Sequence, residues 1–372
     1  MKNDKRIVMT LDAGGTNMVF GAMKGGEYVG ETLSLASNAS DLDLCLNTMV
    51  AGFIMVMERL ERIGEPKPVA ISFAFPGPAD YPQGIIGGNL LNFPSFRNGV
   101  ALGPFLKEKF GIPVYINNDG DLYAFGEALG GVLPEINARL KEAGSAKTYH
   151  NLIGYTLGTG FGIGTVIDGR LNRGDNSCVE TFCLKHPKLE NIVVEDGVAA
   201  RAIKRVYGEQ CGNMNHGLEP KDIAAISNGE RAGNREAAIA AFNELGEVAG
   251  DAMATAVTLL DGLIVIGGGI MNNYKYIMPG ILKSMRAKIK TLSGDEIDRV
   301  QMSVYNLDDP EEFAAFAKGE ARELKVYGTD KTVVYDPKKR VGVMHSKIGA
   351  SKAISLGAYA FALSELDSQK NN

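Results

Sequence analysis

Asp12-Ala13-Gly14-Gly15-Thr16-Asn17 is the stretch that decides the fold, together with the apolar runs that flank it. Residues 7–12 and 17–23 have the composition of two β-strands, and the glycines between them are typical of a tight hairpin. Glycines, which lack a Cβ, also let a phosphate approach backbone N–H groups, and Thr16 adds a hydroxyl donor. These residues alone leave two interpretations open, an ordinary hairpin and a phosphate-binding turn.

The same pattern returns later in the chain. Residues 151–157 and 163–167 are strand-like, and Gly158-Thr159-Gly160-Phe161-Gly162 lies between them. Two such turns can bind a polyphosphate from two sides, which favours a nucleotide site. Neither turn is followed by the Gly-Lys-Ser/Thr of a P-loop, and neither leads directly into a helix as a dinucleotide fingerprint does. We interpret the repeat as an internal duplication of the fold.

Apolar strands alternate with helical stretches along the chain, which is typical of an α/β protein. We predict further strands at 69–75, 113–117 and 263–266, and helices at 42–62 (with Asp41 as N-cap), 121–129, 237–260, 278–291 and 354–364. Because glycine turns end strands in both halves, we expect the ligand to lie in a cleft between two domains.

Bulk composition indicates a soluble globular protein. A length of 372 residues suits two domains, and a net charge of −5 argues against a nucleic-acid partner. The four cysteines form no CxxC pair, which is typical of reduced thiols in the cytoplasm. The N-terminus does not resemble a signal peptide, and no apolar stretch is long enough to span a membrane.

Other polar groups are candidates for chemistry. Asp12 could hold Mg²⁺ through water. Asp119 follows a predicted strand, where a carboxylate can cap a helix or accept the proton of a substrate hydroxyl. The residues that could contact a sugar are Gly77 with its flanking prolines and the polar side chains of Asn89, Asn118, Glu180 and Glu195. Gly267-Gly268-Gly269 either packs a strand end tightly or lets the backbone lie against a planar group.

No pattern in the sequence indicates a structural metal. Cys178, Cys183 and His186 lie near one another in the chain, but their spacing does not match a zinc motif. We therefore expect no structural zinc. His186 lies beside Pro187, and we expect it at the surface.

Taken in order, these motifs resemble the ROK family of sugar kinases, within the actin-like/hexokinase ATPase superfamily. The resemblance covers about 7–270 and resumes near 348–363. It rests on Asp12–Asn17, Pro76-Gly77-Pro78, Asn89-Leu90, Asn118-Asp119, 157–164 and Gly267–Gly269.

The resemblance implies an ATP- and Mg²⁺-dependent hexose kinase with two actin-like (ribonuclease H-like) domains. The turns at Asp12–Thr16 and Gly158–Gly160 would then bind the ATP phosphates, and Gly267–Gly269 would lie near the adenosine. Asp119 matches the family's catalytic base. The residues at sugar-side positions are Gly77, Asn89, Asn118, Glu180 and Glu195.

The same resemblance implies how the chain is divided. A smaller domain would comprise 1–118 with 350–372, and a larger nucleotide-binding domain 119–349. Residues 133–149 and 293–339 look like insertions, the former a surface excursion and the latter peripheral. Two features differ from the family pattern: Cys183 replaces a histidine, and the CxCGxxGC zinc loop is absent.

The predicted reaction is transfer of the ATP γ-phosphate to a sugar hydroxyl, O6 of an aldohexose, with glucose as the first choice. One alternative is a sugar-sensing transcriptional regulator of the same family. Asp12 lies so close to Met1 that we expect no N-terminal DNA-binding module. Another alternative is an actin-like ATPase without a small substrate. We expect a homodimer, since that is the commonest closed assembly.

Overall fold

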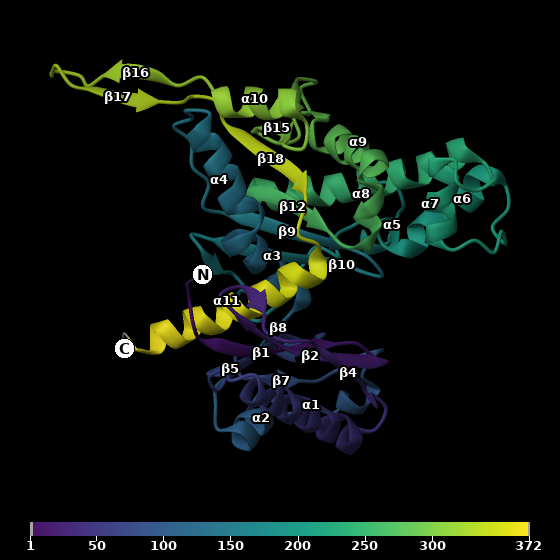
Figure 1. The fold of residues 1–372 in the computed structure, drawn as a ribbon. Helices are drawn as coiled ribbons and strands as arrows, with labels where there is room; N and C mark the ends of the chain where they lie inside the picture. Colours follow the sequence, from purple (N-terminus) through teal and green to yellow (C-terminus); the bar gives the residue numbers. More distant parts are fainter. Residues whose placement is uncertain (1–2, 371–372) are drawn as a thin grey trace. The chain divides into compact units, whose positions relative to one another are not determined.

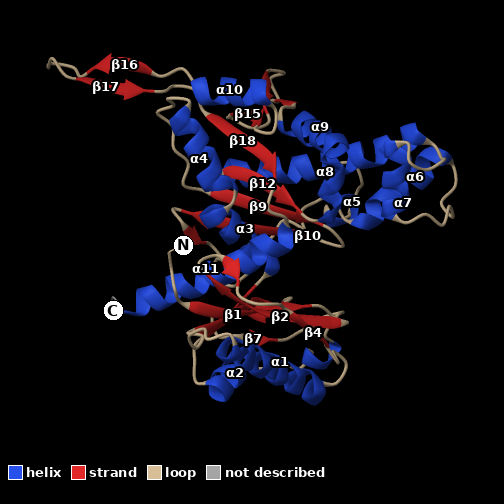
Figure 2. Cartoon of the chain, in the orientation of Figure 1, coloured by secondary structure: helices blue, strands red, loops and turns tan. Residues whose placement is uncertain are grey.

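The computed structural model describes residues 3–370, and its backbone confirms the predicted α/β class (Figures 1 and 2). The chain forms two compact units. The N-terminal unit comprises Met1–Gly131, Arg170–Val179 and Ile348–Asn372, and the C-terminal unit comprises Val132–Gly169 and Glu180–Lys347. Among the described residues, no helix has the length and apolar character needed to cross a bilayer.

The N-terminal unit is built on one six-stranded sheet. Its elements are β1 (Ile7–Ala13), β2 (Asn17–Lys24), β3 (Glu27–Tyr28), β4 (Leu33–Ala36), α1 (Leu42–Arg62), β5 (Ala70–Ala74), β6 (Ala79–Asp80), β7 (Ile85–Ile86), η1 (Pro94–Phe96), α2 (Leu102–Phe110), β8 (Val114–Asn117), α3 (Asp119–Gly130), β11 (Arg170–Leu171) and α11 (Ala350–Lys370). The main sheet has the order β3-β2-β1-β5-β8, with β4 beside β2.

Alternation along β1 explains how this sheet is covered. Ile7, Met9 and Leu11 pack into the core that includes α1, whereas Val8 packs against α11. Successive side chains of a strand point to opposite faces, so a nearly all-apolar strand is buried on both sides. Helix α1 begins as predicted, because the Asp41 carboxylate accepts a hydrogen bond of 3.0 Å from the Leu44 N–H.

Helix α3 belongs to the N-terminal unit, whereas the sequence-based division placed it in the larger domain after residue 118. The reason is close packing on α11. A Cβ on Gly126 would lie 2.0 Å from the Ala353 oxygen, and one on Gly357 would lie 1.9 Å from the Leu122 oxygen. Two helices can approach this closely only where both lack side chains.

The C-terminal unit carries the second large sheet. Its elements are α4 (Val132–Glu142), β9 (Leu152–Leu157), β10 (Phe161–Ile167), α5 (Glu195–Val198), α6 (Ala200–Cys211), α7 (Pro220–Asn228), α8 (Arg235–Leu260), β12 (Leu263–Gly267), η2 (Gly269–Asn273), α9 (Tyr274–Met285), β13 (Lys288–Lys290), β14 (Glu296–Asp298), β15 (Ser303–Asn306), α10 (Pro310–Lys318), β16 (Arg322–Lys325), β17 (Thr332–Tyr335) and β18 (Arg340–His345).

The two large sheets share one topology. In the first, β1 pairs antiparallel with β2 and parallel with β5, which pairs parallel with β8. In the second, β9 pairs antiparallel with β10 and parallel with β12, which pairs parallel with β18. The predicted internal duplication is confirmed at the level of strand order and direction.

Three sequence predictions in the C-terminal unit are wrong in part. Residues 133–149 are not a surface excursion, because α4 buries Val132, Leu133, Ile136 and Leu140. The helix predicted at 278–291 ends at Met285, and β13 follows it. The stretch 293–339 is not wholly peripheral, since β15 pairs with β18 in the main sheet and Phe316 is buried. In each case apolar residues at regular spacing are hidden among charged ones.

Candidate active-site residues

In the N-terminal unit, the candidate residues gather at the carboxyl ends of parallel strands. Asp12 of β1 lies beside Ala74 of β5, which in turn lies beside Asn117 of β8. Asp119 follows two residues after Asn117, at the start of α3. Ligands of open α/β sheets bind at this edge, because the loops that leave the strands converge there.

A pocket of about 480 Å³ opens at this edge. The polar and apolar residues that line it include Asp12, Phe75, Pro76, Asn92, Asp119 and Ser355. Asp12 and Asp119, both singled out from the sequence, therefore face the same space. Asn92 was missed, because one asparagine in a polar loop carries no signal of its own.

Asp119 is exposed to solvent at the first position of α3. Asn118, rather than Asp119, caps α3, with its side-chain oxygen 2.7 Å from the Gly120 nitrogen. The same N–H lies 2.9 Å from the Asp119 carboxylate. Loss of hydration raises the pKa of Asp119, the Gly120 N–H opposes the shift, and the charge of Asp12 adds to it. A raised pKa suits a carboxylate that must accept a proton near neutral pH.

A second carboxylate, Asp121, is buried in the first turn of α3 and was not predicted as a site residue. Burial raises the pKa of Asp121 to about 7; the nearby charge of Arg173 opposes this shift and that of Asp119 adds to it. Arg173 donates a hydrogen bond of 2.8 Å to the Asn117 side chain. The only sequence signal was the spacing Asp119-Gly120-Asp121, and Arg173 is too distant in the chain to have been linked to it.

The first glycine turn is crowded by the protein itself. The Gly14 N–H donates a 3.0 Å hydrogen bond to the Asn17 oxygen, and a Cβ on Gly14 would lie 2.7 Å from that oxygen. A Cβ on Gly15 would meet Asn92 at 3.0 Å. The Ser37 hydroxyl donates a hydrogen bond to the Gly15 carbonyl oxygen. The Ser37 N–H donates another to the Thr16 carbonyl oxygen. The chain needs glycine here whether or not a ligand binds.

The predicted sugar-side loop is anchored beside this turn. The Tyr81 hydroxyl donates a 2.8 Å hydrogen bond to the Phe75 oxygen, and a Cβ on Gly77 would lie 3.1 Å from that hydroxyl. Asn89 is exposed to solvent and is not among the residues that line the 480 Å³ pocket. The structure thus brings Pro76 to the pocket rather than Gly77 or Asn89.

The second glycine turn, in the C-terminal unit, is open. The Gly158 N–H donates to the Gly160 oxygen at 3.1 Å, which closes the turn between β9 and β10. A Cβ on Gly158 would meet no atom within 4 Å. Packing therefore does not explain why residue 158 lacks a side chain.

Glu195 lies against this second turn. Its carboxylate accepts a 3.2 Å hydrogen bond from the Phe161 N–H and an ion pair of 2.9 Å from Arg201. The Arg201 guanidinium also lies 3.4 Å from the Thr159 oxygen, and the Ala200 N–H donates to the Gly158 oxygen. Glu195, predicted at the sugar, thus contacts the turn predicted to bind phosphate.

Gly267–Gly269 lies next to the same turn. Gly267 of β12 pairs with Thr156 of β9, so the two glycine segments leave neighbouring strands at the same edge. Gly268 has φ +95°, and a Cβ on it would lie 2.2 Å from the Leu157 oxygen, so packing requires glycine there. A Cβ on Gly269 would meet no atom within 4 Å. Of Gly268 and Gly269, the second is therefore the one beside open space.

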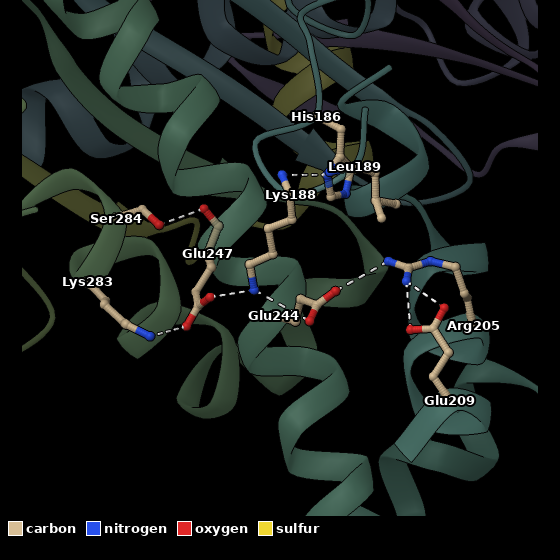
Figure 3. Close-up of polar contacts among 9 residues, drawn as sticks. All are labelled: His186, Lys188, Leu189, Arg205, Glu209, Glu244, Glu247, Lys283 and Ser284. Atoms are coloured by element: carbon tan, nitrogen blue, oxygen red, sulfur yellow. Dashed lines mark hydrogen bonds and ion pairs between the residues drawn. The ribbon is translucent and has the colours of Figure 1, made fainter. Parts of the chain in front are cut away.

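The segment that carries His186 and Lys188 is held by hydrogen bonds and ion pairs (Figure 3). His186 is buried, contrary to the surface position expected. Its Nδ1 accepts hydrogen bonds from the N–H groups of Lys188 and Leu189. Lys188 reaches Glu244 and Glu247 of α8, at 3.4 and 2.6 Å. Burial raises the pKa of the Tyr155 hydroxyl, and the charge of Glu180 adds to this shift.

In the described part of the chain, no group of three or more His, Cys, Asp or Glu side chains is arranged to hold a metal ion. Asp12 and Asp119, which face one pocket and repel each other, fit a cation that keeps most of its water.

Comparisons with known proteins identify relatives of the chain. A family model described as ROK family matches residues 8–306. A glucokinase from Parabacteroides distasonis ATCC 8503 is 57% identical, with a TM-score of 0.89 over 98% of this chain and 99% of that one. A ROK family glucokinase from Streptomyces griseus, solved with glucose and AMPPNP, shares the fold at 18% identity, with a TM-score of 0.60 over 95% of this chain and 98% of that one.

Part of the sequence also matches a regulator. The xylose repressor of Bacillus spizizenii is 32% identical over 106 residues, which are 28% of this chain and 23% of the repressor. The chain thus matches less than a quarter of that relative's length. The family model, by contrast, spans most of both compact units. The structural neighbours support the actin-like fold predicted from the sequence. Because the family model matches residues 8–306, the chain belongs to the ROK family.

Proposed function

We propose that the protein is an ATP-dependent hexose kinase that transfers the γ-phosphate of ATP to a sugar hydroxyl, O6 of an aldohexose. The observation that carries this proposal is the 57% identity to a glucokinase across 98% of the chain. The pocket that holds Asp12 and Asp119 at the ends of parallel strands supports it. Glucose is the first sugar to test, followed by mannose, N-acetylated hexosamines and fructose.

Asp119 is the proposed general base. As the sugar oxygen forms its bond to the γ-phosphorus, the hydroxyl proton passes to the Asp119 carboxylate, and the bond from phosphorus to the β,γ-bridging oxygen breaks with ADP as leaving group. The raised pKa of Asp119 makes it a better proton acceptor than an ordinary carboxylate. The Gly120 N–H bonded to this carboxylate helps to fix its orientation.

Each of the two glycine turns is a proposed contact for ATP phosphates. The residues assigned to this role are Asp12, Gly14, Gly15, Thr16, Asn17, Gly158, Thr159 and Gly160, with Gly267, Gly268 and Gly269 near the adenosine. Backbone N–H groups bind anions without net charge, which suits a chain of net charge −5. Asp12 is the proposed ligand of Mg²⁺, which when bound offsets phosphate charge.

The residues proposed to contact the sugar are those predicted from the sequence, and Glu195 gains a second proposed role. Gly77, Asn89, Asn118 and Glu180 are assigned to the sugar by their match to the family pattern. Glu195 is assigned there too, but its bonds to Phe161 N–H and Arg201 favour an added role in positioning the second turn. Pro76 and Asn92 join the candidates because they line the pocket.

The remaining assignments follow from the proposed reaction. A kinase of free hexoses works where ATP and sugar are both present, so we propose a cytoplasmic location. We also propose a homodimer without nucleic-acid or membrane partners. The regulator alternative rests on the partial match to a xylose repressor, and it predicts sugar-dependent DNA binding without ADP release.

A coupled assay of ADP release, run with each hexose and without sugar, tests this function. We expect ADP release that requires a hexose and Mg²⁺ and that yields one hexose phosphate per ADP. ADP release at the same rate without any sugar would instead support an actin-like ATPase. Absence of turnover with every hexose, combined with DNA binding, would support the regulator.

A further inference from the structure

The loop formed by residues 181–194 leads directly to Glu195, at the start of α5. Backbone hydrogen bonds close this loop on itself. The Val194 N–H donates to the Leu184 oxygen at 2.7 Å, and the Glu195 N–H donates to the Phe182 oxygen at 3.3 Å. The position of Glu195 therefore depends on the position of the loop.

The ring of His186 connects the tip of this loop to α5. Its Nδ1 accepts hydrogen bonds of 3.1 and 3.0 Å from the N–H groups of Lys188 and Leu189. At the other ring nitrogen, a Cβ on Gly197 would lie 2.3 Å from Nε2. The ring thus packs directly on the helix that begins with Glu195, so a displacement of the tip is passed on to that helix.

Lys188 ties the tip of the loop to α8 (Figure 3). Its Nζ lies 2.6 Å from the Glu247 carboxylate and 3.4 Å from that of Glu244. The Glu247 side chain is exposed by only 15%, and a carboxylate so far removed from water needs a cation beside it. Helix α8 is a firm base, because a Cβ on Gly246 would lie 2.1 Å from the Ile277 oxygen of α9.

At its other end, the loop places a carboxylate against the second glycine turn. One Glu195 oxygen accepts the 3.2 Å hydrogen bond from the Phe161 N–H. A Cβ on Gly160 would lie 3.2 Å from the same oxygen. A small shift of α5 would therefore move this carboxylate out of hydrogen-bond range of the turn.

We propose that Lys188 is a positioning residue. Its ion pairs with α8 hold the loop, and through the loop they hold Glu195 where its carboxylate supports the second glycine turn and, in the proposed reaction, contacts the sugar. The kinetic consequence rests on the proposed function. The positioning itself can be measured without turnover.

Lys188→Met tests the proposal, because it removes the charge and keeps a long apolar side chain. We expect the KM for the preferred hexose to rise about three- to tenfold while kcat stays within about twofold, since the substitution weakens binding and leaves Asp119 in place. Lys188→Arg keeps the charge and should return KM to within about twofold of the wild type. Lys283→Met is the matched control, because it removes another 2.6 Å ion pair from Glu247 without touching the loop. It should leave KM unchanged.

Two further measurements separate positioning from a general loss of structure. Lys188→Met in a Glu195→Ala background should weaken hexose binding no further in calorimetry, because the group that Lys188 positions is then absent. Hydrogen exchange, followed by mass spectrometry, should be about three- to tenfold faster across 182–195 in Lys188→Met but not in Lys283→Met. Thermal melting checks that each variant is folded.

Three results would each overturn the proposal: wild-type KM and exchange in Lys188→Met, equal effects from Lys283→Met, or effects of Lys188→Met and Glu195→Ala that simply add. A wild type without hexose-dependent ADP release would overturn the proposed function instead. The exchange rates of Lys188→Met and Lys283→Met would then still decide whether Lys188 holds the loop.

Discussion

The two glycine turns look alike in sequence but differ in what surrounds them. A Cβ on Gly14 or Gly15 would meet the Asn17 oxygen or Asn92 within 3.0 Å. A Cβ on Gly158 would meet nothing within 4 Å. Both turns connect an antiparallel strand pair at the same place in a duplicated sheet. The first turn is glycine-rich because of its own packing, whereas only the second keeps unexplained open space.

This difference separates structural from functional glycines without reference to relatives. A glycine that the protein itself crowds is needed for folding, and its replacement costs stability. A glycine beside open space is free to change unless a ligand uses that space. Substitutions in the two turns should therefore affect different measurements.

The largest effect should come from neither turn but from the carboxylate beside the first. We predict that Asp119→Asn binds hexose with near-normal affinity and loses about 10²–10⁴-fold in kcat, the usual range for a positioned general base. Steady-state kinetics with the preferred hexose, together with sugar binding by calorimetry, measures the two quantities. Near-normal turnover would remove Asp119 from the mechanism and leave the pocket without a base.

Gly158→Val should weaken nucleotide binding without destabilising the fold. Blocking one charge-assisted hydrogen bond to phosphate costs about 1.5–3 kcal/mol, which is roughly ten- to a hundredfold in Kd. The melting temperature should stay near that of the wild type, since a Cβ at this position meets no atom within 4 Å. ATP titration and thermal melting measure both, and an unchanged ATP affinity would refute the phosphate role of this turn.

Gly14→Ala should show the opposite pattern. Its Cβ would lie 2.7 Å from the Asn17 oxygen, so the hairpin must shift. We expect a loss of about 1–2 kcal/mol in the free energy of unfolding, the scale of modest overpacking. Urea denaturation measures it, with Gly158→Ala as the matched control. Equal stability of the two variants would erase the distinction between the turns.

Substitution of Asp121 should change stability only at high pH. Its pKa of about 7 in the folded protein exceeds the ordinary 3.8, so the folded state binds the extra proton between these values. Stability therefore falls as pH rises from about 4 through 7. Asp121→Asn removes this loss, so its free energy of unfolding should exceed that of the wild type by up to about 4 kcal/mol at pH 8, with no gain at pH 4. Urea denaturation at both pH values measures the difference, and an equal change at both would contradict the assignment.

Local signals predicted the fold well where pattern and chemistry coincide. The helix at Leu42–Arg62 and its Asp41 cap follow from helical spacing and a capping carboxylate. The four strands of the two hairpins follow from apolar runs around glycines. Helix α4 was missed because its buried residues are spaced three and four apart within a charged stretch, where charge outweighed periodicity.

The site was predictable only residue by residue. Asp12 and Asp119 were each singled out from the sequence, and the structure shows that they share a pocket. The proximity of Asp121 and Arg173, and the bond from Glu195 to Phe161, depend on pairing between distant segments. No local pattern encodes such contacts, so sequence alone assigned Glu195 only to the sugar.

The most direct test of the account is hexose-dependent ADP release measured on the wild type and on Asp119→Asn under the same conditions, with Mg²⁺ and saturating ATP. The account predicts that wild-type ADP release depends on hexose and is accompanied by an equal amount of hexose phosphate, and that Asp119→Asn loses it by about 10²–10⁴-fold. ADP release that ignores the sugar, or that survives in Asp119→Asn, would contradict it.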